Sequence, residues 1–198
     1  MSKVLVLTAT ISSEENSYSL ELKNRFLKYY KEAHPNDEIE EIDLNTFPIA
    51  QQTLNVDNQK DYWGKDAMGA INQLRNTDKL IVVSPMHNFN IPAMLKNYLD
   101  HILLANETFS YKYSVKGEAK GLLPNLKVQI LTTQGAPYGW YLWGNHTEYL
   151  RGTFDFVGAK VTTPILVSGT KSAPFNKMKP QEVIDEFDPE IKLAATEF

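Results

Sequence analysis

The chain has 198 residues, the size of one compact domain, so we expect a single domain over residues 1–198. Its composition, 42% hydrophobic and 22% charged with 10 glycines and 10 prolines, excludes a disordered chain, a collagen-like repeat and a coiled coil. The formal net charge is −4, without the clustered basic excess that nucleic acid or an anionic membrane attracts, and we expect neither as a partner.

The sequence contains no cysteine, which excludes disulfides, thiolate nucleophiles and cysteine-ligated metals. Residues 2–7 enter a β-branched run directly, without the features of a secretory signal. No apolar run approaches the roughly 20 residues that span a bilayer. We therefore expect a cytoplasmic protein. His34, His101 and His146 are isolated in the sequence, and no ligand spacing predicts a metal site.

Strand-like runs alternate with helical patterns along the chain. Short apolar runs bounded by turn residues predict strands at 4–7, 39–44, 79–84, 127–131 and 160–167. Apolar residues at helical spacing predict helices at 18–33, 63–74, 91–102 and 149–157. Asn90 is a candidate cap of the third helix. Residues 45–60 have little periodicity and predict a long loop.

Helical segments between the strands require crossover connections, so the strands should be parallel. We expect an α/β protein with a flavodoxin-like, doubly wound five-stranded parallel sheet and helices on both faces. The more polar run at 39–44 predicts an edge strand. Ligands of open parallel sheets bind at the carboxyl ends of the strands, so the loops after the first, third and fourth strands are the candidate site.

The first of these loops offers hydroxyl groups at the start of a helix. Residues 17–19 are Ser-Tyr-Ser, and backbone N–H groups with the helix dipole attract an anion there, so a phosphate site fits. Alternatively, Ser17 or Asn16 only caps the helix. Residues 14–15 are glutamates, which oppose an anion unless they face solvent. No GxGxxG or GxxxxGK[ST] motif is present, which excludes a Rossmann dinucleotide fingerprint and a Walker loop.

The second loop, residues 84–92, places an aromatic ring, a methionine and carboxamides at the carboxyl end of a strand. Its backbone and side-chain amides could lie along the edge of a flat heteroaromatic ligand. The alternative is a tight turn that buries Met86 and Phe89.

The second loop also carries a resemblance to a known family. Residues 86–92, followed by Leu95-Lys96-Asn97-Tyr98 and Asp100, closely resemble the flavin-contacting segment of the FMN-dependent NADH azoreductases, in the flavodoxin-like NAD(P)H quinone reductase group. The likeness extends over essentially the whole chain. Other matching segments are the first strand at 2–7, the Ser-x-Ser phosphate clasp at 17–19 and the fourth helix at 149–158.

The resemblance implies an FMN site built from three loops. The residues that would hold the FMN phosphate are Thr10, Ser17, Tyr18 and Ser19. Those that would line the isoalloxazine ring are Pro85, Met86, His87, Asn88 and Phe89. Those that would close over its other edge are Thr133, Gln134 and Gly135.

The chain departs from the family pattern at two places. The family often has Ser-Arg-Gly-Gly in the third loop, whereas this chain has Gln134 and Ala136, so cationic help from that arginine to the flavin is absent. His87 stands where a tyrosine is common and is a candidate proton donor or stacking surface. Residues 138–143 are unusually aromatic and predict either an apolar wall over the flavin or a dimer contact.

The activity that the resemblance implies is that of a homodimeric flavoenzyme. It would take a hydride from NADH or NADPH onto FMN and reduce a quinone or an azo compound in a two-electron, ping-pong sequence. A second hypothesis is an acyl carrier protein phosphodiesterase-type hydrolase, but no metal-ligand cluster or activated nucleophile supports it. A third is a non-enzymatic flavin-binding redox protein, which steady-state NADH oxidation would distinguish from the first.

Overall fold

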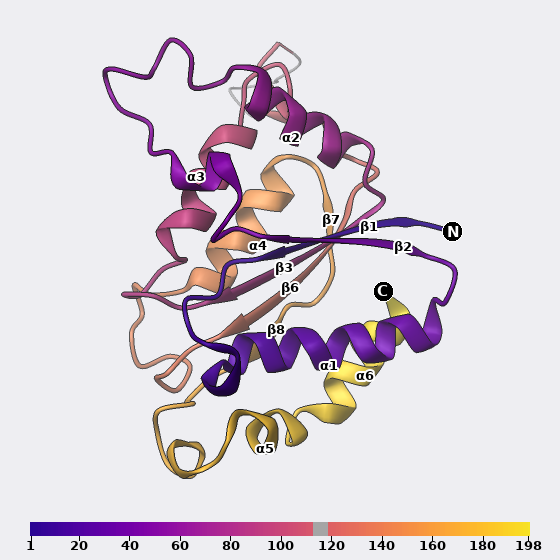
Figure 1. Ribbon diagram of the computed structural model, residues 1–198, viewed down its shortest axis with the longest axis vertical. Helices are drawn as coiled ribbons and strands as arrows, with labels where there is room; N and C mark the ends of the chain where they lie inside the picture. Colours follow the sequence, from indigo (N-terminus) through magenta and orange to yellow (C-terminus); the bar gives the residue numbers. More distant parts are fainter. Residues whose placement is uncertain (113–118) are drawn as a thin grey trace.

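The centre of the molecule is a parallel β-sheet. The computed structural model describes residues 1–112 and 119–198. The strands of this sheet are β1 (Lys3–Thr8), β2 (Glu38–Asp43), β3 (Lys79–Pro85), β6 (Lys127–Thr133), β7 (Lys160–Val161) and β8 (Ile165–Val167). Their order is β2-β1-β3-β6-β7, with β8 also beside β6 (Figure 1). This is the flavodoxin-like order with β2 at an edge, as predicted, and all pairs are parallel.

The predicted fifth strand, residues 160–167, is two short strands. Lys160 pairs with Lys127 at the start of β6, and Ile165 pairs with Leu131 further along it. Pro164 separates them, because proline has no N–H to donate to the ladder. Both short strands lie along the same side of β6, so the sheet still has the five positions expected.

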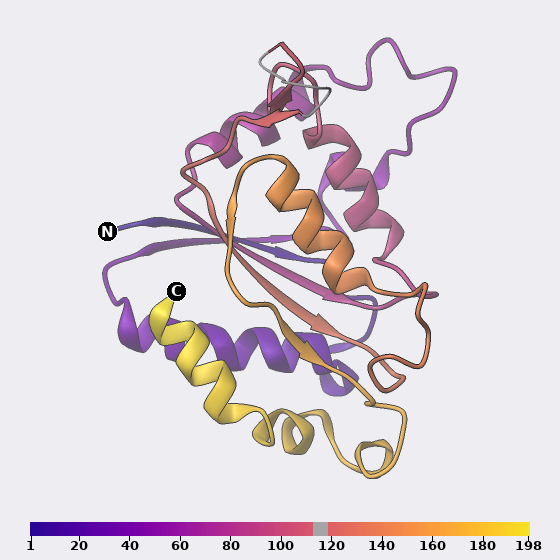
Figure 2. The ribbon, with the colours of Figure 1, turned by 180° about the vertical axis from the view of Figure 1, so that it is seen from behind.

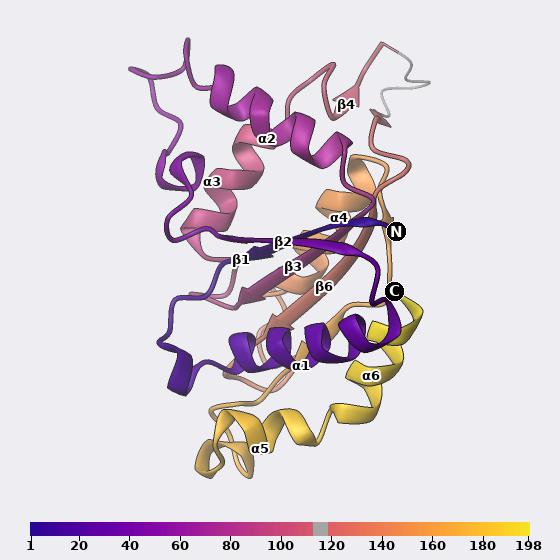
Figure 3. The same cartoon turned by 45° about the vertical axis from the view of Figure 1, so that its right-hand side comes forward.

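Helices cover both faces of the sheet (Figures 1 and 3). One face carries α2 (Lys65–Arg75), α3 (Ala93–Ile102) and α4 (His146–Phe156), and the other carries α1 (Tyr18–Ala33), α5 (Pro180–Asp185) and α6 (Asp188–Glu197). The remaining short elements are 3-10 turns at Glu14–Asn16, Pro48–Gln51 and Phe175–Lys177, and a hairpin of β4 (Phe109–Ser110) and β5 (Lys120–Gly121). Within the described residues, no helix combines the length and apolar character needed to cross a bilayer.

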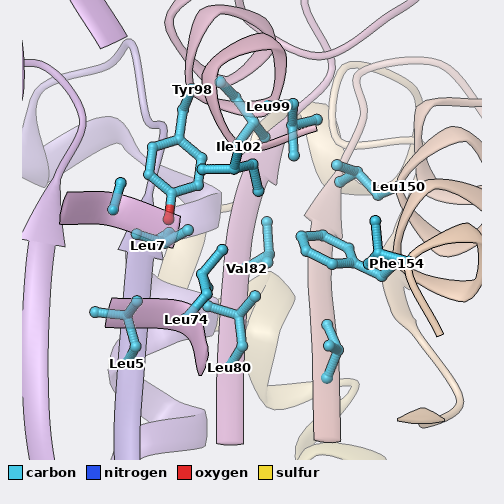
Figure 4. Packing of buried hydrophobic residues seen from close by; sticks show 14 of the residues in the cluster. Leu5, Leu7, Leu74, Leu80, Val82, Tyr98, Leu99, Ile102, Leu150 and Phe154 are labelled. Carbon is cyan, nitrogen blue, oxygen red and sulfur yellow. The ribbon is translucent and has the colours of Figure 1, made fainter. Parts of the chain in front are cut away.

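The side chains of β1 alternate between two apolar layers. Leu5 and Leu7 join the cluster beneath α2, α3 and α4, where the ring of Tyr98 lies next to Leu7 (Figure 4). Val4 and Val6 join the cluster beneath α1, α5 and α6. A strand that is buried on both faces needs apolar residues at every position, which explains the continuous run in the sequence. Burial of each such side chain contributes about 1.5–3 kcal/mol of transfer free energy.

Differences from the sequence prediction also concern the start of α3 and the C-terminal helices. The N-cap of α3 is Pro92 and not Asn90, whose Oδ1 instead accepts the N–H of Ile91 at 2.8 Å. The C-terminal α5 and α6 were not predicted. The last helix, α6, lies beside α1 (Figure 2). Ile191 of α6 is fully buried in the cluster that includes α1 residues, and Arg25 of α1 pairs with Asp188 at 2.5 Å.

Candidate functional site

The loops that follow β1, β3 and β6 lie at one edge of the sheet and are joined by backbone hydrogen bonds. The N–H of Met86 donates to the carbonyl of Thr133 at 2.7 Å, which links the second loop to the third. The N–H of Ala9 donates to the carbonyl of Val83 at 2.9 Å, which fixes the start of the first loop. The amide of Asn45, after β2, donates to the carbonyl of Thr10 at 3.0 Å. The three predicted binding loops are therefore held together.

Three buried hydroxyls form a closed cluster at the start of α1, which we call the hydroxyl cluster. The oxygen of Ser17 lies 3.0 Å from that of Thr10 and 3.2 Å from that of Ser19, and the Ser19 hydroxyl donates to Thr10 at 3.2 Å. Ser17 is also the N-cap, since its Oγ accepts the N–H of Leu20 at 3.2 Å. The predicted helix cap is therefore confirmed for Ser17, and the phosphate site stays a prediction. Because hydroxyl protons rotate, each of the three can turn from its neighbour to an anion.

Tyr18 contributes to this region differently from the two serines. Its hydroxyl donates to the carbonyl of Met178 at 3.4 Å, away from the hydroxyl cluster. Tyr18 is the first residue of α1, where a backbone N–H has no partner within the helix. Its predicted contact with a phosphate therefore rests on this N–H. Glu15 is exposed, and the side chain of Glu14 lies outside the described part of the chain.

The second loop contains a strained two-residue turn. His87 and Asn90 exchange backbone hydrogen bonds of 2.7 and 3.1 Å, and between them Asn88 and Phe89 have φ angles of 45° and 70°. Two successive positive φ angles are those of a type I′ turn. Asparagine tolerates this conformation, but a bulky residue such as phenylalanine adopts it rarely. The turn projects outward: Phe89 is exposed and Met86 only partly buried.

The Phe89 ring packs against the aromatic segment, residues 138–143. Its centroid lies 5.0 Å from that of Tyr141 and 5.8 Å from that of Trp143. Gly144 permits this approach, because a Cβ there would lie 3.0 Å from the Cβ of Phe89. Most of this segment remains exposed, with Trp143 at 73%. The structure thus places an open apolar surface beside the second loop.

The third loop is tied into its surroundings. The side chain of Gln134 is buried, and its amide donates to the carbonyl of Ala136 at 2.9 Å within the same loop. Behind the loop, the hydroxyl of Thr132 lies 2.8 Å from that of Thr147 on α4. His146, at the start of α4, is buried, and burial lowers its pKa to about 4. This histidine is therefore neutral at pH 7.

A fourth segment, which the sequence analysis did not include in the site, closes against the third loop. After β8, the N–H groups of Gly169 and Lys171 donate to the carbonyls of Ala136 and Gly135, each at 2.9 Å. Thr170 adds a bond to the carbonyl of Gln134 at 3.2 Å. Gly169, with a φ of 75°, marks this turn. The rule that applied to the other loops, a position after the carboxyl end of a strand, would have found it.

The donors present fit FMN. A phosphate needs several convergent hydroxyl and N–H donors, which the hydroxyl cluster and the start of α1 provide. For a flat ring, the second loop offers the exposed side-chain amide of Asn88, and the bond from Met86 to Thr133 holds this loop beside the third. The sequence matches the family described as having a flavodoxin-like fold over residues 2–189. The chain belongs to this family.

Individual relatives agree with this assignment. An FMN-dependent NADH:quinone oxidoreductase of Malacoplasma penetrans is 56% identical over all of this chain and 94% of its own. An azoreductase structure from Bacillus anthracis superposes with a TM-score of 0.85 at 27% identity, covering 100% of both chains. A B. anthracis FMN-dependent NADH-azoreductase in complex with FMN has a TM-score of 0.76 at 27% identity, over 100% of this chain and 99% of its own.

Proposed function

We propose that this protein is an FMN-dependent oxidoreductase that passes two electrons from NADH or NADPH to a quinone or an azo compound. The observation that carries the proposal is the hydroxyl cluster at the start of α1, on the same sheet edge as the outward turn of the second loop. The names of the similar proteins supply the class of donor and acceptor. The proposal treats residues 1–198 as one FMN-binding domain that acts in the cytoplasm.

The proposal assigns distinct tasks to the three predicted loops. Thr10, Ser17, Ser19 and the backbone of Tyr18 bind the phosphate, while residues 85–89 and 133–135 line the ring. When bound, FMN supplies the hydride chemistry, and the chain binds, orients and shields it. His87 is exposed next to Asn88 and is the candidate side chain for delivering a proton to the acceptor. The names of the relatives favour this activity over the phosphodiesterase hypothesis.

The decisive experiment is an absorption spectrum of the purified protein loaded with FMN, recorded before and after anaerobic NADH. We expect a bound-flavin spectrum that bleaches, and steady-state reduction of a quinone with parallel double-reciprocal lines, since donor and acceptor use one site in turn. Bleaching without turnover would support the non-enzymatic redox protein instead. Failure to bind FMN would overturn the proposal.

We also propose a two-fold homodimer that covers the aromatic segment. Large exposed aromatic and aliphatic side chains beside a site are typical of interface cores, and Leu142 is 89% exposed. In this arrangement the aromatic segment serves both as dimer contact and as the wall of the site. Leu142→Glu should yield a monomer in light scattering, while Leu193→Glu, at an exposed position on α6, should leave the dimer intact. A monomeric wild type with full activity would contradict this part of the proposal.

A further inference from the structure

The loops assigned to FMN contain no positive charge. Residues 9–17, 86–92 and 134–145 include no lysine or arginine, and the first of them contains two glutamates. A phosphate monoester carries about −1.5 to −2 charges at pH 7. The hydroxyl cluster supplies hydrogen bonds to such a group but no opposite charge. The structure places the opposite charge in the segment after β8.

Residues 168–179, which we call the basic segment, contain three lysines and no acidic residue. This segment passes the start of α1 before it enters α5 (Figure 2). Lys171 is anchored there by its backbone bond to Gly135, and its side-chain carbons lie against that glycine, where an added Cβ would be 2.9 Å from Cδ of Lys171. The lysine stem is thus positioned on the third loop.

A groove of about 710 Å³ separates the basic segment from the start of α1. Its lining includes Asn16 and Tyr18, which are sequence neighbours of Ser17 in the hydroxyl cluster, and Lys171 and Lys179 of the basic segment. Glu15 is the acidic residue of the lining. In the part of the chain that the structure describes, no carboxylate forms an ion pair with either ammonium group. The groove that borders the predicted phosphate position is therefore lined by two lysines and one glutamate, while the carboxylate of Glu182 accepts the backbone N–H of Lys179 at 2.7 Å.

We infer that Lys171 and Lys179 form an anion subsite for a phosphate group in this groove. The inference rests on the proposed function, which brings two phosphate-bearing molecules to this edge of the sheet. One source is the phosphate of FMN, and the other is the phosphate-bearing part of NADH or NADPH. Both would gain the same charge-assisted hydrogen bonds.

Lys171→Met and Lys179→Met test the subsite, because methionine keeps the apolar stem and removes the charge. Lys177→Met is the matched control, since Lys177 belongs to the same segment but does not line the groove. If the ligand is FMN, its Kd should rise about tenfold in either variant and that of riboflavin should not change. If the ligand is the donor, KM for NADH or NADPH should rise about tenfold, and KM for the phosphate-free 1-benzyl-1,4-dihydronicotinamide should not.

Further outcomes separate the subsite from other roles. Lys171→Arg should restore the affected constant, and the effect of the methionine variants should shrink at high salt because the contact is ionic. If the methionine variants weaken the binding of riboflavin or the benzyl donor as much as that of the phosphate-bearing ligand, the subsite is overturned. The subsite alone is also overturned if the wild type binds FMN and oxidises NADH and neither methionine variant changes any of these constants. A wild type that takes up no FMN would overturn the proposed function and the subsite together.

Discussion

At the scale of single residues, the second loop depends on a backbone conformation that most side chains disfavour. Asn88 is exposed, so a change there alters φ preferences with little loss of buried contact. We expect Asn88→Ala to lower the free energy of unfolding by about 1 kcal/mol, because alanine at a φ of 45° is strained. Asn88→Gly should be as stable as the wild type. Urea unfolding measures both, and equal stability of the alanine variant would contradict the observed turn.

The hydroxyl cluster combines helix capping and proposed ligand binding, and paired variants separate the two. Ser17→Ala removes the cap and should lower the free energy of unfolding by about 1 kcal/mol. Ser19 lies inside α1, where alanine is well tolerated, so Ser19→Ala should leave the free energy of unfolding unchanged. Both variants should weaken FMN about tenfold in a fluorescence titration, with riboflavin as the control. If Ser19→Ala binds FMN as tightly as the wild type, the cluster is only a cap.

At the scale of elements, strong periodicity made the central strands and α1 predictable from the sequence. The predicted helix at 18–33 matches α1 at both ends, because apolar spacing and a following turn define it. The C-terminal helices were not predicted because their apolar periodicity is weak. Helix α6 buries only Ile191 and Ala195 and is otherwise largely polar. Residues 160–167 form two strands because of Pro164. The sequence prediction treated them as one strand, since apolar residues lie on both sides of this proline. The role of the basic segment depends on tertiary contacts, which spacing along a chain does not reveal.

The packing of α6 on α1 provides a test at this scale. Ile191 is fully buried, so Ile191→Ala should lower the free energy of unfolding by about 3 kcal/mol through lost burial and a cavity. Leu193 lies on the same helix but is 61% exposed. Leu193→Ala should therefore change the free energy of unfolding by less than about 0.5 kcal/mol. Chemical denaturation of the two variants gives the comparison. Similar effects at both positions would mean that α6 does not dock as described.

At the scale of the whole molecule, one buried and one partly buried group make stability depend on pH. Burial lowers the pKa of His146 from 6.5 to about 4, so the fold favours its neutral form. Burial alone would raise the pKa of Asp37, but hydrogen bonds from Tyr30, the Ser2 N–H and Lys79 outweigh it and hold the pKa at about 2, below 3.8. In both cases the unfolded chain binds the proton more readily. Stability is therefore lost as pH falls.

We expect the free energy of unfolding to fall in two separate pH ranges. The contribution of His146 should disappear as pH falls from about 6.5 to 4, and that of Asp37 from about 3.8 to 2. The urea midpoint against pH should show both decreases. His146→Leu should remove the upper window and keep the lower one, and Asp37→Asn should do the reverse. A flat profile between pH 6.5 and 4 in the wild type would contradict the burial of the neutral imidazole.

The attachment of Gly169–Lys171 to the third loop has a consequence for the order in which a newly made chain matures. The hydroxyl cluster and the turn of the second loop are encoded in the first 90 residues, but the bonds that brace the third loop come from residues 169–171. During synthesis, the segments that we assign to the phosphate and to one edge of the ring therefore leave the ribosome before residues 169–171 do. The FMN site that we propose would be complete only once residues 169–171 have been made and have packed against the third loop.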